Sequence, residues 1–314
     1  MKKNILITGG NGFLGESLAF KFRDNFKVFL ASRNNSENQK KSLITNTEFI
    51  PMDVSNISSV RDAVIFAKPN IIIHAAATKF VDLSEKFPFE CIDTNIIGSS
   101  NIARVALENK IQTVIGISTD KAAQPIGNLY GFTKATMERI FLSSNNISKT
   151  NFVCLRFGNI AWSTGSVLPI WKQMFEKNRT ILTTGPYMRR FFFTVNDASN
   201  FVALALKNQS KFSGKIICPE MKSAQMLNIL KLWIKKYGGN FKVIKKRAGD
   251  KIDEMLIGKN ELSKTNILKI NKSKYFIIDP EKDVKKPLKN EINSKNSKKM
   301  NDREIYKILK FGLY

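Results

Sequence analysis

Histidine and cysteine are scarce in this 314-residue sequence. Its single histidine rules out a histidine-rich metal site. The cysteines, Cys91, Cys154 and Cys218, are widely spaced within apolar runs, which indicates reduced packing residues rather than a disulfide or a metal-binding set. No apolar run approaches the roughly 20 residues that a membrane helix needs, and residues 1–3 do not lead into a signal-peptide core. We therefore expect no metal, no membrane insertion and a cytoplasmic location.

Acidic residues are few relative to basic ones, 26 against 51, which gives a formal net charge of +25. The lysines are scattered among asparagines and isoleucines, and the sequence has no RGG segment, zinc-finger spacing or RNA-binding motif. We interpret the excess as a compositional bias and expect no nucleic-acid partner. A positive field of this size would still steer doubly anionic small molecules toward the protein.

A short apolar run at residues 4–8 is followed at once by a glycine-rich turn and by a segment, 16–26, that is typical of a helix. Glycines in such a turn let the backbone approach a pyrophosphate closely, and the helix N-terminus offers free N–H groups to the phosphates. This order predicts dinucleotide binding. The residues expected to contact the cofactor here are Gly9, Asn11, Gly12, Phe13, Leu14 and Gly15.

The next expected strand, 27–32, ends without the acidic residue that would bind a ribose 2′-hydroxyl. It runs instead into Ser32 and Arg33, and an arginine at this place can pair with a 2′-phosphate. The pattern favours NADP as the cofactor, with NAD as the alternative.

A further strand at 48–52 is followed by Asp53 and Val54, where folds of this kind often touch the adenine. Asp53 has a second interpretation, as the N-terminal cap of a helix at 57–67. The sequence alone leaves both roles of Asp53 open.

Strands and helices alternate further along the chain, with strands expected at 70–74, 112–118 and 151–156 and helices at 94–109 and around Tyr130. This alternation predicts an α/β fold with a doubly wound parallel (Rossmann) sheet. Ligands of such sheets bind beyond the carboxyl ends of the strands. The segments at those ends are Gly9, the stretch 74–77 with Ala75 and Ala76, Ser118 with Thr119, and 156–159.

Beyond residue 160 the pattern changes to turns rich in glycine and proline, which we interpret as a smaller, partly interleaved substrate-binding region. We expect a cofactor-binding Rossmann domain at 1–158, to which 194–212 returns, and a substrate-binding region at 159–193 and 213–280. The lysine-rich C-terminal tail, 281–314, is expected to be loop or partly disordered, with a short terminal helix.

Tyr130 and Lys134 stand one helical turn apart, so their side chains share a helix face. The ammonium and a positive nicotinamide would together lower the pKa of the phenol, and the tyrosinate could then take a hydroxyl proton while hydride leaves. Thr119, Asp120 and Lys121 precede this pair. An acid and an amine side by side can do proton chemistry only if their surroundings shift their pKa values.

These motifs carry a family likeness. The chain resembles the extended short-chain dehydrogenase/reductase superfamily, and within it the soluble nucleotide-sugar 4,6-dehydratases that act on UDP-N-acetylglucosamine. The likeness runs nearly end to end, and its segments are 74–79, 118–122 with Tyr130 and Lys134, 156–160, 165–169, 188–194, and 247–251 with Glu254. Thr119, Asp120 and Lys121 are the specific part, because simple 4-epimerases of this superfamily usually have small residues beside the Ser or Thr.

The resemblance implies roles for five catalytic residues. Tyr130 would deprotonate the sugar 4-hydroxyl as hydride passes to NADP, while Thr119 holds that hydroxyl and Lys134 holds the cofactor ribose. Lys121, if neutral, would remove the proton on carbon 5. Asp120, if protonated, would help the 6-hydroxyl to leave as water. Carbon 5 could be reprotonated on either face, with or without inversion.

The resemblance also implies substrate contacts. Arg190 is the natural partner of the uridine diphosphate by charge and fork geometry, and Lys79 would lie near the sugar. The other expected substrate-binding residues are Asn159, Ser166, Val167, Arg247 and Glu254. A homo-oligomer and a place in surface glycan biosynthesis are further implications of the family.

Three features depart from the family pattern. One extra residue precedes Tyr130, and Gly127 could absorb it as a bulge; otherwise Tyr130 would be displaced, and an angstrom-scale displacement can lower a rate about a hundredfold. Arg189 stands where the family tends to have threonine, which would affect the sugar that is accepted. Ala248 and Asp250 replace the family's Pro and Glu and would alter the local loop.

Two other functions stay open. A UDP-hexose 4-epimerase would use Tyr130 and Thr119 with the same cofactor but would not need Asp120 and Lys121. A non-catalytic Rossmann nucleotide-binding protein would need neither Tyr130 nor Lys134. The acid and the amine beside Thr119 favour the dehydratase.

Overall fold

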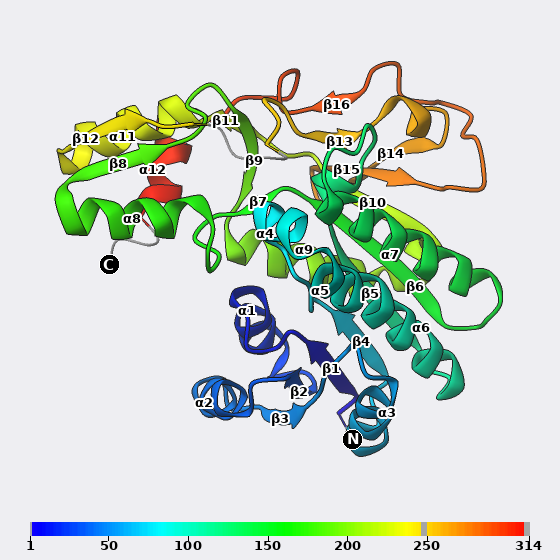
Figure 1. Ribbon diagram of the computed structural model, residues 1–314. Coiled ribbons are helices and arrows are strands. Elements are labelled where there is room, and N and C mark those ends of the chain that lie inside the picture. The colour runs from blue at the N-terminus through cyan, green and yellow to red at the C-terminus, as the bar shows by residue number, and fades with distance from the viewer. Residues whose placement is uncertain (1, 246–249, 311–314) are drawn as a thin grey trace.

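The computed structural model describes residues 2–245 and 250–310 (Figure 1). Within these ranges, nine strands form one sheet in the order β14-β15-β10-β6-β5-β4-β1-β2-β3. The strands from β10 to β3 are parallel, and β15 and β14 extend the other edge as antiparallel neighbours. Their bounds are β1 Asn4–Thr8, β2 Lys27–Ser32, β3 Glu48–Pro51, β4 Ile71–His74, β5 Thr113–Thr119, β6 Asn151–Phe157, β10 Lys215–Pro219, β14 Thr265–Ile270 and β15 Ser273–Ile278.

Helices cover both faces of this sheet, so the predicted doubly wound α/β fold is confirmed. α1 packs against α2 and α9, while α6 packs against α3 and α7. The strand residues between the layers, such as Ile5, Leu6 and Ile7, are fully buried, as expected for parallel strands that are covered on both faces. The bounds are α1 Phe13–Phe22, α2 Asn35–Thr45, α3 Ile57–Ala67, α6 Gly98–Glu108, α7 Leu129–Asn146, α9 Val195–Lys207 and α10 Gln209–Phe212.

Local sequence signals set the helix starts that matter for the site. β2 and α3 have the predicted bounds, whereas α1 begins earlier than predicted, at Phe13, because Gly12 is its N-cap. α7 follows Asn128, whose side chain accepts a hydrogen bond of 2.8 Å from the Gly131 amide. Both helices therefore begin at the sheet edge where the parallel strands end.

A second, smaller region follows β6 and has its own core. It contains a sheet in the order β11-β9-β7, a parallel pair β12-β8, and helices α8, α11 and α12. The ring of Trp233 lies 6.1 Å from Trp162 and 6.4 Å from Trp171 in this core. The bounds are β7 Asn159–Ile160, α8 Val167–Asn178, β8 Thr180–Thr183, β9 Arg189–Phe193, β11 Ser223–Gln225, α11 Met226–Tyr237, β12 Asn240–Val243 and α12 Asp302–Lys310.

Part of the range expected in the substrate-binding region extends the large sheet instead. β10, β14 and β15 all fall within 213–280, and β10 pairs with β6 because its apolar residues 216–218 suit a strand that is buried on both faces. Within the described part of the lysine-rich tail, residues 281–301 are mostly turns and loop apart from the short strand Ile292–Asn293, and a short helix, Asp302–Lys310, follows. This helix, α12, buries Ile305, Ile308 and Leu309 in the second core, because these positions share one helix face.

Short elements complete the chain around the site. β13 pairs with β16 and brings the segment near residue 255 against the C-terminal tail. Across the described ranges, no helix combines the length and the apolar character that crossing a membrane requires. The bounds are α4 Val81–Lys86, α5 Pro88–Ile92, the π-helix η1 Asp93–Ile97, the 3-10 helices η2 Asp120–Ala122 and η3 Lys259–Glu261, β13 Met255–Ile257 and β16 Ile292–Asn293.

Candidate active site

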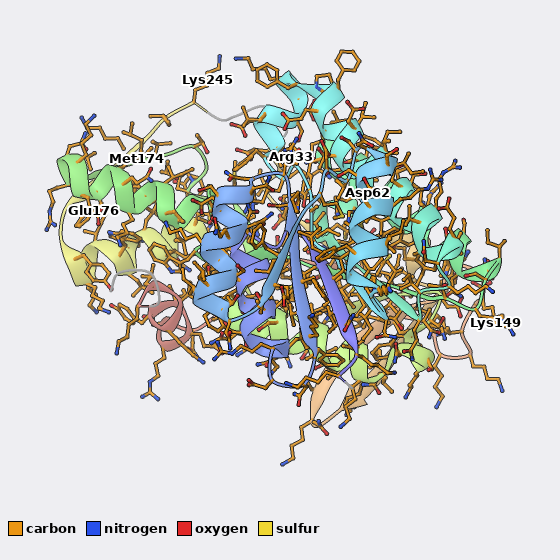
Figure 2. The ribbon with its side chains drawn as sticks, turned by 90° about the horizontal axis from the view of Figure 1, so that it is seen from below. Arg33, Asp62, Lys149, Met174, Glu176 and Lys245 are labelled. Carbon is orange, nitrogen blue, oxygen red and sulfur yellow. The ribbon has the colours of Figure 1, made fainter. Side chains whose placement is uncertain are left out.

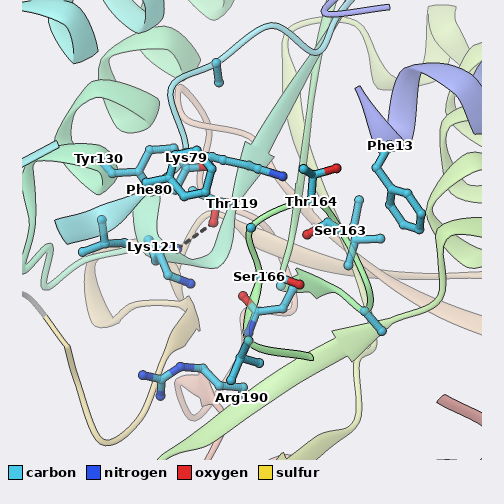
Figure 3. A pocket seen from close by; sticks show the side chains of 18 of the residues that line it. Phe13, Lys79, Phe80, Thr119, Lys121, Tyr130, Ser163, Thr164, Ser166 and Arg190 are labelled. Atoms are coloured by element: carbon cyan, nitrogen blue, oxygen red, sulfur yellow. Dashed lines mark hydrogen bonds between the residues drawn. The ribbon is translucent and has the colours of Figure 1, made fainter. Parts of the chain in front are cut away.

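A pocket of about 480 Å³ lies at the carboxyl ends of β1, β4, β5 and β6 and reaches to β9 and the loop before α8. Open α/β sheets bind their ligands at this edge. In the view of Figure 3, Lys121 and Tyr130 lie across the pocket from Ser163 and Thr164. The predicted site residues that line it are Gly9, Asn11, Gly12, Phe13, Leu14, Gly15, Ala75, Ala76, Lys79, Thr119, Lys121, Tyr130, Lys134, Asn159, Ser166, Val167 and Arg190.

The glycine turn between β1 and α1 has the shape that a pyrophosphate requires. Gly9 has a φ of +67°, and a side chain there would meet the Ala76 backbone at 2.9 Å. A Cβ on Gly15 would lie 2.5 Å from the Gly10 carbonyl oxygen. Gly12 is the N-cap residue of α1 and has no side chain to accept hydrogen bonds from the first amides of the helix. These amides therefore remain available to a ligand in the pocket. The turn therefore fits the phosphates of a dinucleotide.

Lys134 extends from α7 into the wall of the same pocket and is 2% exposed. Its Nζ donates to the Met137 sulfur at 2.9 Å, and burial lowers the pKa of its ammonium to about 8. A thioether is a weak acceptor, so the ammonium can still donate to hydroxyl groups in the pocket. Lys134 and the glycine turn together fit the ribose and phosphates of a nicotinamide dinucleotide.

Ser32 and Arg33 lie at the end of β2, outside the lining of the pocket. Ser32 Oγ donates to Asn38 Oδ1 at 2.7 Å. The side chain of Arg33 is 62% exposed, and its Nη2 lies 4.0 Å from a Glu90 carboxylate oxygen; Figure 2 shows it at the end of the strands, beside the α4–α5 segment. Such an exposed and distant ion pair is weak, so the guanidinium is free to turn to another anion.

Asp53 and Val54 also lie outside the pocket lining. Asn56, and not Asp53, caps α3, because Asn56 Oδ1 accepts hydrogen bonds from two amides in the first turn at 2.9 and 3.2 Å. Asp53 Oδ1 accepts from the amide and hydroxyl of Ser55 at 3.0 and 2.7 Å. The interpretation of Asp53 as the helix cap is therefore wrong, and its contact with adenine stays a prediction.

The polar group beside the pocket is built at the end of β5, where Thr119 leads into η2. The Thr119 hydroxyl donates to Asp120 Oδ1 at 3.0 Å. It also accepts from the Lys121 amide at 3.4 Å (Figure 3). Lys121 Nζ lies 3.0 Å from the same Asp120 oxygen and 3.4 Å from Glu254 Oε1. The amine is therefore held between two carboxylates while it lines the pocket.

The extra residue before Tyr130 does not remove the phenol from the site, since Tyr130 lines the pocket together with Thr119 and Lys121. Gly127 leaves room for the Lys251 side chain, with which a Cβ at this position would collide. Lys251 Nζ donates to the Pro125 carbonyl. The longer loop is therefore packed against the segment that begins at residue 250.

Burial and charge act in opposite directions on the acid and the amine. Burial lowers the pKa of Lys121, but the carboxylates of Asp120 and Glu254 outweigh it and raise that pKa above its usual value. Burial raises the pKa of Asp120 more strongly than the neighbouring ammonium lowers it. Asp120 is fully buried and absent from the pocket lining, and among the described residues its Oδ2 has no hydrogen-bond partner. Asp120 is thus connected to the pocket through its contacts with Thr119 and Lys121, which both line it.

The phenol of Tyr130 differs from the sequence-based expectation. Burial raises its pKa to about 12, and this effect exceeds the opposing influence of Lys121 and of a hydrogen bond with Thr119. The expected lowering of the phenol pKa is therefore not produced by the protein groups alone. The sequence could not reveal this, because the low polarity around the ring comes from segments that are distant in the chain.

The expected substrate residues Arg190 and Arg247, and the positions that depart from the family pattern, lie in different places. Arg190 lines the pocket with 9% exposure, and its Nε lies 3.5 Å from Glu254 Oε1. Arg189 points elsewhere: its guanidinium donates twice to Asp253, each at 2.6 Å, and it does not line the pocket. Asp250 does line it. Arg247 and Ala248 lie outside the described residues.

Several lining residues were missed by the sequence interpretation. Phe80 packs against Gly165, whose φ is +71° and whose Cβ would collide with the Phe80 ring. The glycine-rich turns around 165 and 185 were the available signal, but they do not show which side chains face the pocket. The lining residues that lie neither among the predicted site residues nor in the segments of the family likeness are Phe80, Val81, Asp82, Ile117, Ala161, Ser163, Thr164, Trp171, Thr183, Thr184, Gly185 and Met226.

A buried ion network holds the elements behind the pocket together. Arg156, on β6, is 1% exposed and donates to Glu138 of α7 at 3.0 and 2.7 Å. It also donates to Glu261 at 2.9 Å, and Ser118 Oγ donates to Glu138 at 2.5 Å. These bonds fix α7 relative to β5 and β6. Because Glu138 follows Lys134 by one helical turn, they also fix the part of the helix that carries Lys134.

Replacing Arg156 by leucine is expected to lower the free energy of unfolding by about 3–5 kcal/mol, because Glu138 and Glu261 would lose the cation that compensates their burial. Urea unfolding followed by circular dichroism measures the change. Arg61→Leu is the matched control, since it removes an exposed arginine–glutamate pair and should hardly change the unfolding midpoint. Equal effects of both variants would contradict the importance of the buried network.

Comparisons with known proteins show the family of the chain. A family described as "Polysaccharide biosynthesis protein" matches residues 5–278. A UDP-N-acetylglucosamine 4,6-dehydratase (inverting) of Campylobacter jejuni is 32% identical over 287 residues, which cover 88% of this chain and 83% of that protein. A UDP-glucose 4-epimerase of Rickettsia bellii is 30% identical, with coverage of 98% and 95%.

Solved structures share the architecture. Pen from Bacillus thuringiensis superposes with a TM-score of 0.88 at 27% identity, covering 98% of this chain and 97% of that one. A UDP-glucuronic acid 4-epimerase from Bacillus cereus, in complex with UDP-glucuronic acid and NAD, has a TM-score of 0.71 at 19% identity, covering 79% and 88%, and this likeness shows the fold alone. By the family match and the shared fold, the chain belongs to the polysaccharide biosynthesis protein family of the extended short-chain dehydrogenase/reductase superfamily, as its motifs predicted.

Proposed function

We propose that the chain is a UDP-N-acetylglucosamine 4,6-dehydratase, an NADP-dependent lyase that forms a UDP-4-keto-6-deoxy-N-acetylhexosamine for surface glycan biosynthesis. The observation that carries the proposal is the Asp120–Lys121 pair at 3.0 Å beside Thr119, with Lys121 and Tyr130 lining one pocket. Epimerisation at carbon 4 needs one proton acceptor, whereas loss of water needs a second proton-transfer group. The name of the Campylobacter relative supports the same assignment.

A nicotinamide cofactor held in the pocket would supply the hydride chemistry, from carbon 4 of the sugar and back to carbon 6. Among the chain's own residues, Tyr130 would accept the 4-hydroxyl proton and Thr119 would orient that hydroxyl. Lys134 and the glycine turn would hold the dinucleotide. Since burial raises the pKa of Tyr130, the phenol depends on added positive charge in the loaded site to act near neutral pH.

The second proton-transfer step would use Lys121 as the group that faces the sugar. A proton shift along the 3.0 Å contact from Lys121 Nζ to Asp120 Oδ1 turns an ammonium and a carboxylate into an amine and a carboxylic acid. The amine would take the carbon 5 proton, and the resulting ammonium would give a proton to the departing 6-hydroxyl. Asp120 would supply and store protons through Lys121, because its own carboxyl does not line the pocket.

The substrate would lie with its diphosphate at Arg190 and its sugar near Tyr130 and Lys121. Arg190 supports this orientation because a guanidinium fork binds phosphate oxygens in pairs. Asn159, Ser166, Val167 and Lys79 line the same space. Arg247 is proposed as a further contact from the family likeness.

Cofactor choice gives a first prediction for this function. Arg33→Ala should weaken NADP binding about tenfold and leave NAD binding nearly unchanged, because only NADP offers a 2′-phosphate to the guanidinium. Titration of protein fluorescence with each cofactor measures the two affinities, and Arg61→Ala is the control for loss of one exposed arginine. Equal weakening for both cofactors would count against an NADP-specific role of Arg33.

A UDP-hexose 4-epimerase is the second candidate, and the name of the Rickettsia relative favours it. Incubation of the purified protein with UDP-N-acetylglucosamine and NADP, followed by mass spectrometry of the sugar nucleotide, separates the two. A product lighter by one water supports the dehydratase, and proton NMR then assigns carbon 5. An isomer of unchanged mass supports the epimerase, and binding without any conversion supports a non-catalytic nucleotide-binding protein.

We also propose that the enzyme is cytoplasmic and assembles as a homo-oligomer, as the family likeness implies. Light scattering coupled to size-exclusion chromatography tests the assembly, since a single species at the 35.6 kDa of one chain would contradict it.

A further inference from the structure

The segment that runs from residue 250 to residue 261 packs against the catalytic loop from several directions. Lys251 Nζ donates to the Pro125 carbonyl, and Gly258 lies so close to Gln124 that a Cβ would collide with its carbonyl oxygen. The Leu256 carbonyl accepts a hydrogen bond of 3.1 Å from Arg156. A segment more than a hundred residues away in sequence thus fixes the loop between β5 and α7.

Glu254 is the acidic side chain that this segment places beside Lys121. It is 4% exposed, and its Oε1 lies 3.4 Å from Lys121 Nζ and 3.5 Å from Arg190 Nε. Its backbone is held by two hydrogen bonds with Ser294. The Glu254 amide donates to Ser294 Oγ at 3.0 Å, and the Glu254 carbonyl accepts from the Ser294 amide at 2.9 Å. The neighbouring Asp253 is held by Arg189 at 2.6 Å.

The expected role of Glu254 as a substrate contact does not agree with its position. Its carboxylate is not part of the pocket lining, although both of its cationic neighbours are. A carboxylate would also repel a diphosphate, so direct contact with a nucleotide sugar would weaken binding. Its two interactions point to the amine and to the guanidinium instead.

We infer that Glu254 is a positioning residue that holds the Lys121 amine at the pocket wall and keeps it apart from the diphosphate bound at Arg190. The inference rests on the proposed function and deepens it. Asp120 and Glu254 balance the charges of Lys121 and Arg190, so the group of four is neutral when all are ionised. Without Glu254 the group carries an excess positive charge, and the flexible Lys121 ammonium is drawn toward the phosphates and away from carbon 5.

The kinetic signature separates positioning from substrate binding. Glu254→Gln should lower kcat for water loss about a hundredfold, as expected for an angstrom-scale misplacement, while KM stays within about threefold. Glu254→Asp should recover part of kcat because it restores the charge. Glu220→Gln is the control, since it neutralises a surface glutamate paired with Lys274 and Lys298 and should retain full activity. A raised KM with unchanged kcat would overturn the inference.

Chemical labelling tests the same contact without any catalysis. Lys121 is faced by Asp120 from its own loop, by Glu254, by Arg190 and by the phenol of Tyr130, and Glu254 raises the pKa of its ammonium. Glu254→Gln lowers that pKa, so at a given pH more of the amine is unprotonated. Acetylation of Lys121 by acetic anhydride, followed by peptide mass spectrometry, should be several times faster in the variant, while the exposed Lys149 reacts equally in both proteins.

The kinetic and labelling experiments distinguish failure of the dehydratase proposal from failure of the positioning role of Glu254. If the wild-type protein removes no water from UDP-N-acetylglucosamine but Glu254→Gln accelerates Lys121 acetylation, the dehydratase proposal fails and the placement of the amine by Glu254 stands. If wild-type dehydrates and neither kcat nor Lys121 acetylation changes in the variant, the positioning role of Glu254 is refuted.

Discussion

Replacing Lys121 by methionine is expected to lower the rate of water loss by about a hundredfold to ten-thousandfold, which is the usual contribution of a positioned acid–base group. Methionine keeps a long side chain against the pocket wall but has no amine to take the carbon 5 proton. The glycine turn and Lys134 are untouched, so NADP affinity should remain that of the wild type. Mass spectrometry of the sugar nucleotide measures the water loss, and fluorescence titration measures cofactor binding.

A spectroscopic readout shows whether the variant has failed at this step or has simply misfolded. Because Tyr130 and Thr119 remain, Lys121→Met should still let substrate reduce part of the bound nicotinamide, and the absorbance of the reduced ring should rise on adding UDP-N-acetylglucosamine. Lys149→Met, at an exposed site outside the pocket, serves as the control. Normal water loss by Lys121→Met would remove Lys121 from the chemistry and contradict its role as the carbon 5 base.

The parts of this site that the sequence predicts are those set by short-range patterns. The glycines at 9, 12 and 15 follow an apolar strand directly. The positive φ at Gly9 and the close backbone approaches at Gly9 and Gly15 explain why these two positions lack side chains. The Tyr130–Lys134 spacing depends only on the pitch of one helix. The family likeness assigned the same residues, and the pocket brings them together.

The parts that the sequence does not predict depend on contacts between distant segments. The position of Glu254 between Lys121 and Arg190 requires β13 and the C-terminal tail to be in place, and no local pattern describes this. The seclusion of Asp120 from the pocket has the same origin, as does the raised pKa of Tyr130. Desolvation is a sum over all surrounding segments, so it follows from the folded structure and not from the motif.

The contrast between short-range patterns and distant contacts also explains which parts of the fold the sequence predicts. Strands from β1 to β6 alternate with helices, and this pattern alone indicates a parallel sheet. β14 and β15 join the sheet through antiparallel pairing beyond β10, although their range was expected in the substrate-binding region, because half-exposed strands show a weaker apolar pattern than strands covered on both faces. The burial of Ile305, Ile308 and Leu309 of α12 in the second core likewise depends on contacts with distant segments.

Replacing Tyr130 by phenylalanine is expected to lower turnover by about a hundredfold to ten-thousandfold and, unlike Lys121→Met, to stop the reaction before any hydride moves. The variant keeps the ring and removes only the hydroxyl that would accept the proton of the sugar 4-hydroxyl. Stopped-flow absorbance should therefore show no reduced nicotinamide on addition of UDP-N-acetylglucosamine, while NADP affinity stays unchanged because Lys134 and the glycine turn remain.

The pair of variants orders the two proton-transfer steps. The partly buried phenol has a raised pKa, so wild-type turnover should increase with pH wherever ionisation of Tyr130 limits the rate, and this dependence should disappear from the residual activity of Tyr130→Phe. Tyr275→Phe, at a tyrosine stacked on Phe201 outside the pocket, is the matched control and should keep the pH dependence of the wild type. Accumulation of reduced nicotinamide in Tyr130→Phe would show that another base takes the 4-hydroxyl proton, and Lys121, which lines the same pocket, would then be the first group to test.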